Sequence, residues 1–344
     1  MKALVLESYN NFVYKDVPKP SPKPGEVLIK VKACAVCGSD VQGMDGSTGR
    51  RRPPIIMGHE AAGCIEELGK GVDGYKVGDR VTFDSTIYCN NCPMCNSGNV
   101  NLCDSRRVLG VSCEDYKLDG AFAEYVVVPA YVLYSLPDNV SYIQAAMIEP
   151  LAIAYHAATM VNITKGSSAL VVGVGTIGML LLQVVKAMGA ENIIAVDIDD
   201  DKLKTALKLG ANTAVNSKDS DALEKIISAT KNTKGVEFAF DATGIEQTVN
   251  LCLKSLALNG KQVLVGNIAQ KISFPLQWVV TRQLSLFGSC ASAGEYDRCI
   301  KLISDGSVDV EALISKTVPL SEGQEWISRV YNREPGLNKI VLIP

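Results

Sequence analysis

Short apolar runs separated by turn-forming residues characterise the chain up to about residue 150. β-Branched residues dominate these runs, and segments such as Pro22–Gly25 interrupt them. Short strands bounded by proline and glycine are typical of β-rich, barrel-like domains. We therefore expect a β-rich domain over residues 1–153, with strands that include Val27–Val31, Ala61–Glu66, Arg80–Phe83 and Glu124–Val128.

A different pattern begins at about residue 154, where apolar strands alternate with amphipathic helical stretches. This alternation predicts a parallel, doubly wound sheet over residues 154–287, and hence an α/β fold class. Residues 288–344 add one more helix and the strand-like KIVLIP, and we expect this tail to return to the first domain. The expected strands are Ala169–Val172, Asn192–Val196, Val236–Phe240 and Lys261–Val265, and the expected helices are 176–188, 200–209, 245–257 and 294–305.

Composition narrows the class of protein. A chain of 344 residues exceeds the usual size of one core, and its 47% hydrophobic and 21% charged residues are ordinary for a globular protein. The net charge of -3 gives no reason to expect a nucleic-acid partner. Neither a signal peptide nor a membrane-spanning apolar segment is expected. The eleven cysteines are clustered, which favours reduced thiols, metal binding and a cytoplasmic location.

A glycine-rich turn lies between a predicted strand and a predicted helix. Gly173-Val174-Gly175-Thr176-Ile177-Gly178 has the GxGxxG spacing, in which the glycines permit a tight turn, approach to a pyrophosphate and close helix packing. A glycine turn without a ligand is the alternative. However, Asp197 ends the next strand, where a carboxylate can accept hydrogen bonds from ribose hydroxyls. Asp197 and the neighbouring Asp199–Asp201 would repel a 2′-phosphate, so NAD is favoured over NADP.

Four cysteines form a compact lobe at residues 89–103. Their spacing is C-x2-C-x2-C-x7-C, and four thiolates can close a tetrahedron around zinc without leaving an open position. Four unrelated thiols and a nucleic-acid zinc finger are the alternatives, but the lobe lacks the basic helix that a finger requires. The spacing therefore predicts a structural zinc site at Cys89, Cys92, Cys95 and Cys103.

A second set of candidate ligands is dispersed along the first domain. Cys37, His59, Glu60 and Glu149 together offer a thiolate, an imidazole and carboxylates, which is the composition of a catalytic zinc site with an open position. Each residue has a plainer interpretation when taken alone. Cys37 could form a redox pair with Cys34, although Cys34 is better explained as a core residue. His59 could be a hydrogen-bonded core histidine, and Glu149 could cap a helix.

These motifs together resemble the zinc-containing medium-chain dehydrogenase family. Gly58-His59-Glu60-x2-Gly63-x5-Gly69-x2-Val72 is similar to the zinc signature of that family. The segment Val77–Val81, the cysteine lobe, the GxGxxG turn and Asp241–Gly244 then follow in the family's order. The resemblance covers essentially the whole chain. It implies a GroES-like catalytic domain, a Rossmann domain and an active site in the cleft between them.

Within the family, Glu149-Pro150 resembles the polyol branch, which includes sorbitol (L-iditol), galactitol-1-phosphate and threonine dehydrogenases. This resemblance implies that Cys37 and His59 bind zinc, with Glu60 and Glu149 as alternating or water-mediated ligands. Many relatives have a histidine where this chain has Gln42, so a proton relay through an imidazole is absent there. By resemblance, the cofactor-binding residues comprise Gly173, Gly175, Ile177, Gly178, Asp197, Lys202, Val265, Gly266, Gly288 and Ser289.

The expected activity is the NAD-linked oxidation of a secondary alcohol of a polyol to a ketone. Ser39, Glu60 and Glu149 are the expected catalytic residues, and Ser39 would accept the alcohol proton. The basic run Arg50–Arg52 could be a solvated loop, or it could hold a substrate phosphate, as in a polyol-phosphate dehydrogenase. L-Threonine oxidation and a non-catalytic zinc- and NAD-binding protein are further alternatives. The ligand set argues against a zinc-free quinone reductase. Family analogy suggests a homodimer or homotetramer.

Overall fold

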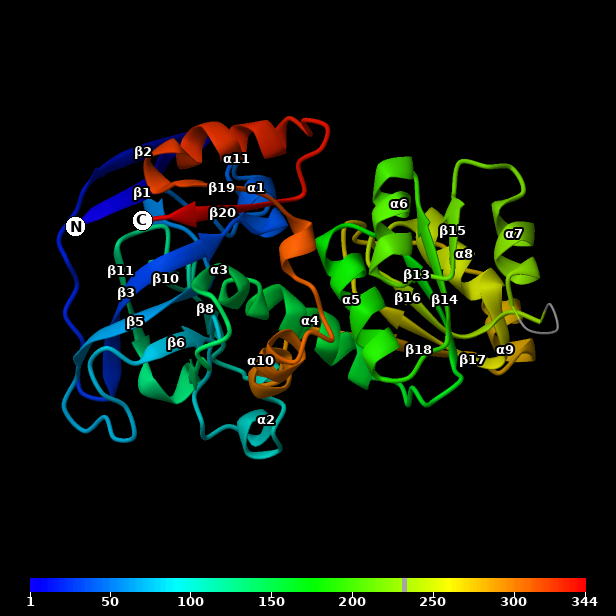
Figure 1. Cartoon of the computed structure of the whole chain (residues 1–344), viewed down its shortest axis with the longest axis horizontal. Helices are drawn as coiled ribbons and strands as arrows, with labels where there is room; N and C mark the ends of the chain where they lie inside the picture. The colour runs from blue at the N-terminus through cyan, green and yellow to red at the C-terminus, as the bar shows by residue number, and fades with distance from the viewer. Residues whose placement is uncertain (231–233) are drawn as a thin grey trace. The chain divides into compact units, whose positions relative to one another are not determined.

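The computed structural model describes residues 1–230 and 234–344, which divide into two compact units (Figure 1). The chain passes from unit 1 to unit 2 after Glu149 and returns at Ala293, a few residues from the pattern changes expected near 153 and 288. Unit 1 consists of Met1–Glu149, Ala293–Asp305 and Val310–Pro344, and unit 2 consists of Pro150–Ser292 and Gly306–Asp309.

Unit 1 is built on a seven-stranded sheet whose centre is the long strand β3. The strand order is β12-β6-β5-β3-β20-β19, and β11 also pairs with β3. A second sheet has the order β2-β1-β4. The strands of these two sheets are β1 (Lys2–Ser8), β2 (Asn11–Asp16), β3 (Glu26–Ala35), β4 (Ile55–Ile56), β5 (Glu60–Leu68), β6 (Arg80–Phe83), β11 (Tyr125–Pro129), β12 (Leu133–Ser135), β19 (Ile314–Pro319) and β20 (Lys339–Ile343).

Apolar residues from both ends of the chain form the core of unit 1. Phe12, Phe83 and Phe122 are fully buried there with Leu342 from the C-terminal strand. That strand, β20, pairs antiparallel with β3 through Leu342 and Cys34. The smaller elements are β7 (Thr86–Ile87), β8 (Arg107–Val108), β9 (Val111–Ser112), β10 (Lys117–Leu118), α1 (Gly38–Gly43), α2 (Pro93–Asn96), α3 (Tyr142–Ala145), α10 (Tyr296–Ser304) and α11 (Gly323–Tyr331). Helix α4 (Ile148–Thr159) begins in unit 1 and continues into unit 2.

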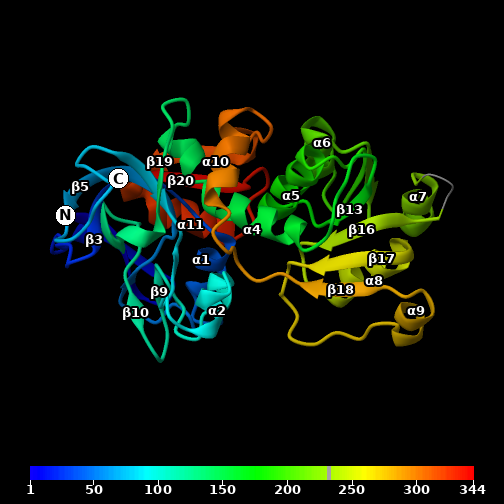
Figure 2. The same ribbon diagram turned by 90° about the horizontal axis from the view of Figure 1, so that it is seen from below.

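Unit 2 is a six-stranded parallel sheet with the order β15-β14-β13-β16-β17-β18. Figure 2 shows β16, β17 and β18 of this sheet side by side. Helices α5 and α6 contact each other and the strands β13 and β14, whereas α7 and α8 contact each other. Right-handed crossovers place these two pairs on opposite faces of the sheet. The elements are β13 (Ser168–Val172), α5 (Thr176–Ala187), β14 (Asn192–Asp197), α6 (Asp200–Leu209), β15 (Thr213–Asn216), α7 (Ala222–Ser228), β16 (Val236–Asp241), α8 (Glu246–Ser255), β17 (Leu256–Leu264), α9 (Leu276–Thr281) and β18 (Ser285–Gly288).

This order is the doubly wound topology, and the expected fold class is confirmed. From β13 the chain adds strands toward one edge of the sheet, through β14 to β15, and from β16 it adds them toward the other edge. In such sheets, ligands bind beside the carboxyl ends of the strands where this order reverses, here β13 and β16. The hydrophobic pattern did not predict the edge strands β15 and β18 or the helices α7 and α9, because all four are short and alternate weakly. The expected helix at 245–257 ends at Ser255, since the buried Leu256 already begins β17.

Candidate functional site

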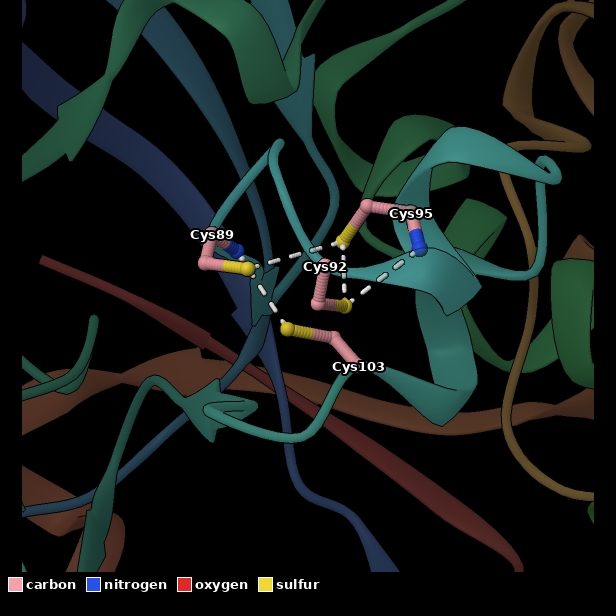
Figure 3. A group of neighbouring side chains, drawn as sticks. All are labelled: Cys89, Cys92, Cys95 and Cys103. Carbon is pink, nitrogen blue, oxygen red and sulfur yellow. Dashed lines mark hydrogen bonds between the residues drawn. The ribbon is translucent and has the colours of Figure 1, made fainter.

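The four lobe cysteines converge within unit 1, with their sulfur atoms turned toward one another (Figure 3). Cys92 caps α2, and its Sγ accepts a hydrogen bond from the N–H of Cys95 at 3.4 Å. The Sγ atom of Cys95 lies 3.5 Å from that of Cys92 and 3.9 Å from that of Cys89. The N–H of Cys89 donates to Cys103 Sγ at 3.3 Å. All four sulfurs lie within 4.8 Å of one another.

This arrangement fits a closed zinc site. Four sulfurs at about 2.3 Å from one zinc ion lie about 3.8 Å apart in a tetrahedron, and the two sulfur–sulfur distances above bracket that value. The N–H of Cys95 stabilises the thiolate of Cys92 and lowers its pKa to about 6. Thiolate is the form that binds a metal. Because all four ligands come from the protein, such an ion would be structural.

A second group forms where α1 meets the start of β5. The ligand atoms of Cys37, His59 and Glu60 lie within 4.8 Å of one another. Cys37 caps α1, and its Sγ accepts a hydrogen bond from the N–H of Ser39 at 3.4 Å. His59 is 5% exposed and Glu60 is 1% exposed, whereas Cys37 is partly exposed. A soft thiolate, an imidazole and a carboxylate form a mixed donor set that suits zinc and leaves a fourth position for another ligand.

Asp40 connects two members of this group. It is fully buried, its Oδ2 accepts a hydrogen bond from the N–H of Cys37 at 3.3 Å, and its Oδ1 lies 3.5 Å from His59 Nδ1. Burial opposes the charged carboxylate, but His59 and Arg51 outweigh it and lower the pKa of Asp40 to about 2. A carboxylate facing Nδ1 orients the ring so that Nε2 is available to a metal.

The second group also contains a buried cation that the sequence analysis missed. Lys339 Nζ donates to both carboxylate oxygens of Glu60, at 3.0 and 2.7 Å, and to the carbonyl of Val36 at 3.1 Å. Burial disfavours the ammonium, but Glu60, Cys37 and Glu149 outweigh it, so the pKa of Lys339 is raised. The only signal in the sequence is a lysine at the start of an otherwise apolar strand, KIVLI.

Glu149 lies in the first turn of α4, outside the three-residue group. Ser85 Oγ donates a hydrogen bond to its Oε1 at 3.4 Å. Burial, together with the charges of Glu60 and Asp84, raises the pKa of Glu149 to about 7. The geometry therefore places Glu60, rather than Glu149, beside Cys37 and His59, although Lys339 already engages both oxygens of Glu60.

The arginine run differs from the solvated loop that its composition suggests. Arg50 and Arg52 are exposed, and Arg52 Nη2 lies 3.7 Å from Glu114. Arg51 is instead only 4% exposed and forms an ion pair with Asp40, with Nη2 and Oδ1 separated by 3.0 Å. Arg51 is therefore not free to hold a substrate phosphate, and among the three only Arg50 and Arg52 keep that option.

In unit 2, the glycine-rich turn joins β13 to α5. Gly173 has φ +87°, which favours glycine, and its N–H donates to the carbonyl of Val196 at 2.8 Å. A Cβ on Gly178 would lie 1.9 Å from the carbonyl oxygen of Gly173, so only glycine permits this close packing. A Cβ on Gly175 would meet nothing within 4 Å, and no side chain caps α5. These features fit a dinucleotide pyrophosphate at the helix start.

Asp197 lies beside this turn at the end of β14. Its Oδ2 accepts a hydrogen bond from the N–H of Val174 at 2.8 Å, and its Oδ1 accepts from the N–H groups of Ile198 and Asp199 at 2.8 and 3.1 Å. The carboxylate is thus held in place by the backbone. Lys202 follows in the first turn of α6, where its N–H donates to Asp199 Oδ1 at 3.3 Å. Ile177 is half-buried in the first turn of α5.

The remaining expected cofactor residues share one cavity of unit 2. This cavity has a volume of about 360 Å³, and Val265, Gly266, Gly288 and Ser289 line it together with Gly244. The Oγ atom of Ser289 is buried there and has no hydrogen-bond partner among the residues that the structure describes. A buried hydroxyl without a partner is costly unless a ligand or water satisfies it. The cavity therefore fits part of a dinucleotide.

Comparison with known proteins places these sites in a family. The model of the alcohol dehydrogenase GroES-like domain matches residues 23–138, and that of zinc-binding dehydrogenases matches residues 176–305. Sorbitol dehydrogenase of Bacillus subtilis (strain 168) is 32% identical over 348 residues, which cover 100% of this chain and 97% of the relative. The chain belongs to the zinc-dependent medium-chain dehydrogenase family. The resemblance inferred from the sequence motifs is thereby confirmed.

Solved structures agree with this membership in the zinc-dependent medium-chain dehydrogenases. A zinc-binding dehydrogenase of Sinorhizobium meliloti 1021, bound to NADP, has 31% identity and a TM-score of 0.91, covering 100% of this chain and 99% of that one. An alcohol dehydrogenase of Escherichia coli CFT073, complexed with NADH, has 29% identity and a TM-score of 0.92, with the same coverage. Both dinucleotides therefore occur among the structural relatives, so the preference for NAD stays a prediction.

The state of the cysteines and the character of the helices are two further features of the chain. All eleven cysteines are free thiols, as metal binding requires, and Cys34 is buried in the core rather than paired with Cys37. None of the helices in residues 1–230 and 234–344 combines the length and apolar character needed to cross a bilayer.

Proposed function

We propose that this dehydrogenase oxidises a secondary alcohol of a polyol, of the sorbitol or L-iditol type, to a ketone, using zinc and NAD. The observation that carries the proposal is the mixed group of Cys37, His59 and Glu60 in a chain of this family. Its similarity to a sorbitol dehydrogenase supports the substrate class. A second zinc, held by the cysteine lobe, would stabilise the fold.

Zinc, when bound by Cys37 and His59, supplies a Lewis acid that polarises the hydroxyl oxygen of the substrate. The protein's part is to hold the ligands rigidly. The Asp40 carboxylate faces His59 Nδ1 at 3.5 Å, and Lys339 balances the charge of Glu60 through two hydrogen bonds. Glu149, with a pKa raised to about 7 by burial, can carry or release a proton near neutrality.

Ser39 is the group that we propose accepts the alcohol proton. It is exposed and lies two residues after Cys37, whose Sγ accepts the Ser39 N–H. The Ser39 Oγ receives a hydrogen bond from Arg51 at 3.2 Å, which leaves a second lone pair for the substrate hydroxyl. The exposed Gln42 cannot titrate near neutrality, so the proton passes from Ser39 Oγ to water or to a ribose hydroxyl.

NAD, when bound in unit 2, would supply the hydride acceptor through its nicotinamide. In unit 2, the glycine turn would hold the pyrophosphate, Asp197 would accept hydrogen bonds from the ribose hydroxyls, and the buried Ser289 hydroxyl would find a partner on the cofactor. The carboxylate of Asp197 would repel a 2′-phosphate, which supports NAD over NADP. Asp197→Ser should therefore reduce the preference for NAD.

The structure bears on the substrate through Arg51, because this arginine is buried on Asp40 and cannot hold a phosphate. This leaves only the exposed Arg50 and Arg52 as candidates for that role, and the similarity to a sorbitol dehydrogenase leads us to favour a neutral polyol over a polyol phosphate or L-threonine. The test is an assay of the purified, zinc-replete enzyme on sorbitol, xylitol, galactitol 1-phosphate, L-threonine and 2-butanol, each with NAD and NADP. The highest kcat/KM should be for a neutral polyol with NAD. Failure to reduce either cofactor with any of these compounds would contradict the proposal and favour a non-catalytic protein.

We further propose a homo-oligomer, a dimer or a tetramer, in a reducing compartment such as the cytoplasm. Reduced thiols are needed for both zinc groups. At the β18 side of unit 2, Leu258, Leu276 and Val280 are 70%, 64% and 68% exposed, and exposed apolar side chains beside an edge strand favour association. Light scattering on the eluting protein should give a mass of two or four chains, and a mass of one chain would contradict the proposal.

A further inference from the structure

Arg51 occupies an unusual position for a residue of a basic loop. Its side chain is 4% exposed, and its Nη2 donates to Asp40 Oδ1 at 3.0 Å and to Ser39 Oγ at 3.2 Å. The Nη1 atom donates to the carbonyl of Arg50 at 3.1 Å. One guanidinium nitrogen therefore bridges the carboxylate that faces His59 and the hydroxyl proposed to accept the proton.

The side chain of Arg51 packs beside Gly43, and hydrogen bonds hold the backbone on both sides of it. A Cβ on Gly43 would lie 2.5 Å from Arg51 Cγ, so the glycine leaves the room that the arginine stem fills. The backbone on both sides of Arg51 is fixed by strand β9, because the N–H of Arg52 donates to the carbonyl of Ser112 at 2.9 Å and the N–H of Ser112 donates to the carbonyl of Arg50 at 3.2 Å. A solvated basic loop would require neither the space beside Gly43 nor the hydrogen bonds to β9, so Arg51 does not belong to such a loop.

The contacts of Asp40 show what the guanidinium achieves. Asp40 Oδ2 is occupied by the N–H of Cys37, and Oδ1 faces both Arg51 and the imidazole of His59. A buried carboxylate with only the imidazole beside it would be an uncompensated charge. Arg51 compensates this charge and fixes the direction in which Oδ1 points, at 3.5 Å from His59 Nδ1.

Arg51 also acts on Ser39. A guanidinium has donors but no acceptor, so the Ser39 hydroxyl must accept from Arg51 and turn its own proton elsewhere. One lone pair of Oγ is thus occupied and the hydroxyl is held in one orientation. An exposed serine without this contact would rotate among three rotamers.

We propose that Arg51 is a positioning residue of the reaction, which holds the Ser39 hydroxyl and, through Asp40, the His59 imidazole in the orientations that turnover and metal binding require. This inference rests on the proposed function for its kinetic consequence. Its structural consequence, the geometry of the metal held by Cys37 and His59, does not depend on which alcohol is the substrate.

The test compares Arg51→Met, Arg51→Lys and the neighbouring Arg52→Met, which removes an exposed arginine with the same change of charge. Each variant is loaded with Co²⁺, its visible absorption spectrum is recorded, and the loss of metal to a chelator is timed. Arg51→Met should alter the spectrum of the Cys37–His59 ion and release that ion at least about 10-fold faster than the wild type. Arg51→Lys should restore part of both properties, and Arg52→Met should match the wild type.

Kinetics provide the second readout. Arg51→Met should lower kcat about 10- to 100-fold with less than about a 3-fold change in KM, because the orientation of the site is lost rather than substrate binding. A wild-type cobalt spectrum, release rate and kcat in Arg51→Met would overturn the inference, as would identical defects in Arg52→Met. If Arg51→Met fails to fold, the same readouts on Arg51→Lys decide. If the wild type oxidises no alcohol, the proposed function fails, but the cobalt measurements still test Arg51.

Discussion

The two metal-ligand groups of unit 1 are built in opposite ways. The cysteine lobe takes all its ligands from one short segment, lies partly exposed, and has its sulfurs stabilised by N–H groups of the same segment. The second group takes ligands from α1 and from the start of β5, is largely buried, and is surrounded by Asp40, Arg51 and Lys339. A closed site can be self-contained, whereas a site with an open position depends on distant residues to fix its ligands and balance its charge.

The sharpest way to test this contrast is Cys37→Ser. We expect a loss of kcat/KM of about 10⁴-fold, equivalent to about 5 kcal/mol in the barrier, because one ligand of the open site is lost. Metal analysis should show a fall from two zinc ions per chain to one, while the Tm changes little. Cys113→Ser, which removes a thiol outside both groups, should retain full activity. Wild-type turnover in Cys37→Ser would refute the role of the second group.

Lys339→Met tests the charge balance of the buried group. It leaves the Glu60 carboxylate without its partner in an apolar environment, and we expect a loss of about 3 to 5 kcal/mol in the free energy of unfolding. Urea denaturation measures this change. Lys339→Arg keeps a cation at the position and should recover most of the loss. Equal stability of Lys339→Met and the wild type would show that the ion pair is unimportant.

Asp84, which lies near Ser85 and Glu149, should make the free energy of unfolding depend on pH. Burial raises the pKa of Asp84 to about 7. Its Oδ1 accepts a hydrogen bond from the N–H of Thr86, and its Oδ2 has no hydrogen-bond partner in residues 1–230 and 234–344. Between about pH 4 and 7 the folded chain holds a proton that the unfolded chain releases, so this carboxyl lowers stability as the pH rises through that window.

Asp84→Asn should therefore become more stable relative to the wild type between pH 5 and pH 8, by up to about 3 kcal/mol. The measurement is urea denaturation of both proteins at the two pH values. Asp138→Asn, which changes a fully exposed carboxylate, should show no such difference. A constant gap between Asp84→Asn and the wild type across this pH range would contradict the assignment of the titration to Asp84.

Cys92→Ser should have the smallest and most local effect. Loss of the lobe zinc should unfold the lobe locally and expose residues 89–103 to hydrogen exchange, while kcat/KM stays within about 10-fold of the wild type. Hydrogen-exchange mass spectrometry of the lobe peptide and of a peptide from β3 separates local from global change. A loss of activity as large as that of Cys37→Ser would show that the two groups are not independent.

The structure brings together the predicted site residues that are local in the chain. The lobe spacing, the GxGxxG turn and Asp197 each depend on residues within one or two neighbouring elements, and the strand β6 was predicted with its exact bounds. The alternation of strands and helices in unit 2 was sufficient for the fold class. Elements with weak patterns, such as α7 and β18, were missed because their burial depends on neighbours in the sheet.

The residues that support the second group could not be found in this way. Lys339 reaches Glu60 across 279 positions, and nothing in KIVLIP distinguishes a buried lysine from one at a sheet edge. Arg51 lies among three arginines of identical type, and only the space beside Gly43 and the carboxylate of Asp40 select it for burial. Burial of a charge is decided by the partner that the fold supplies, and that partner is not visible in local sequence.

The distance along the chain between Glu60 and Lys339 has a consequence for biosynthesis. At about 5 to 20 residues per second, the ribosome takes about 15 to 55 seconds to extend the chain by the 279 positions from Glu60 to Lys339. During this time Glu60 has no lysine to neutralise it, so burial of its carboxylate is unfavourable. Unit 2, which is nearly continuous in the chain, is synthesised in that interval and can fold first. Unit 1, which is synthesised first, is therefore the last part of the chain to complete its fold.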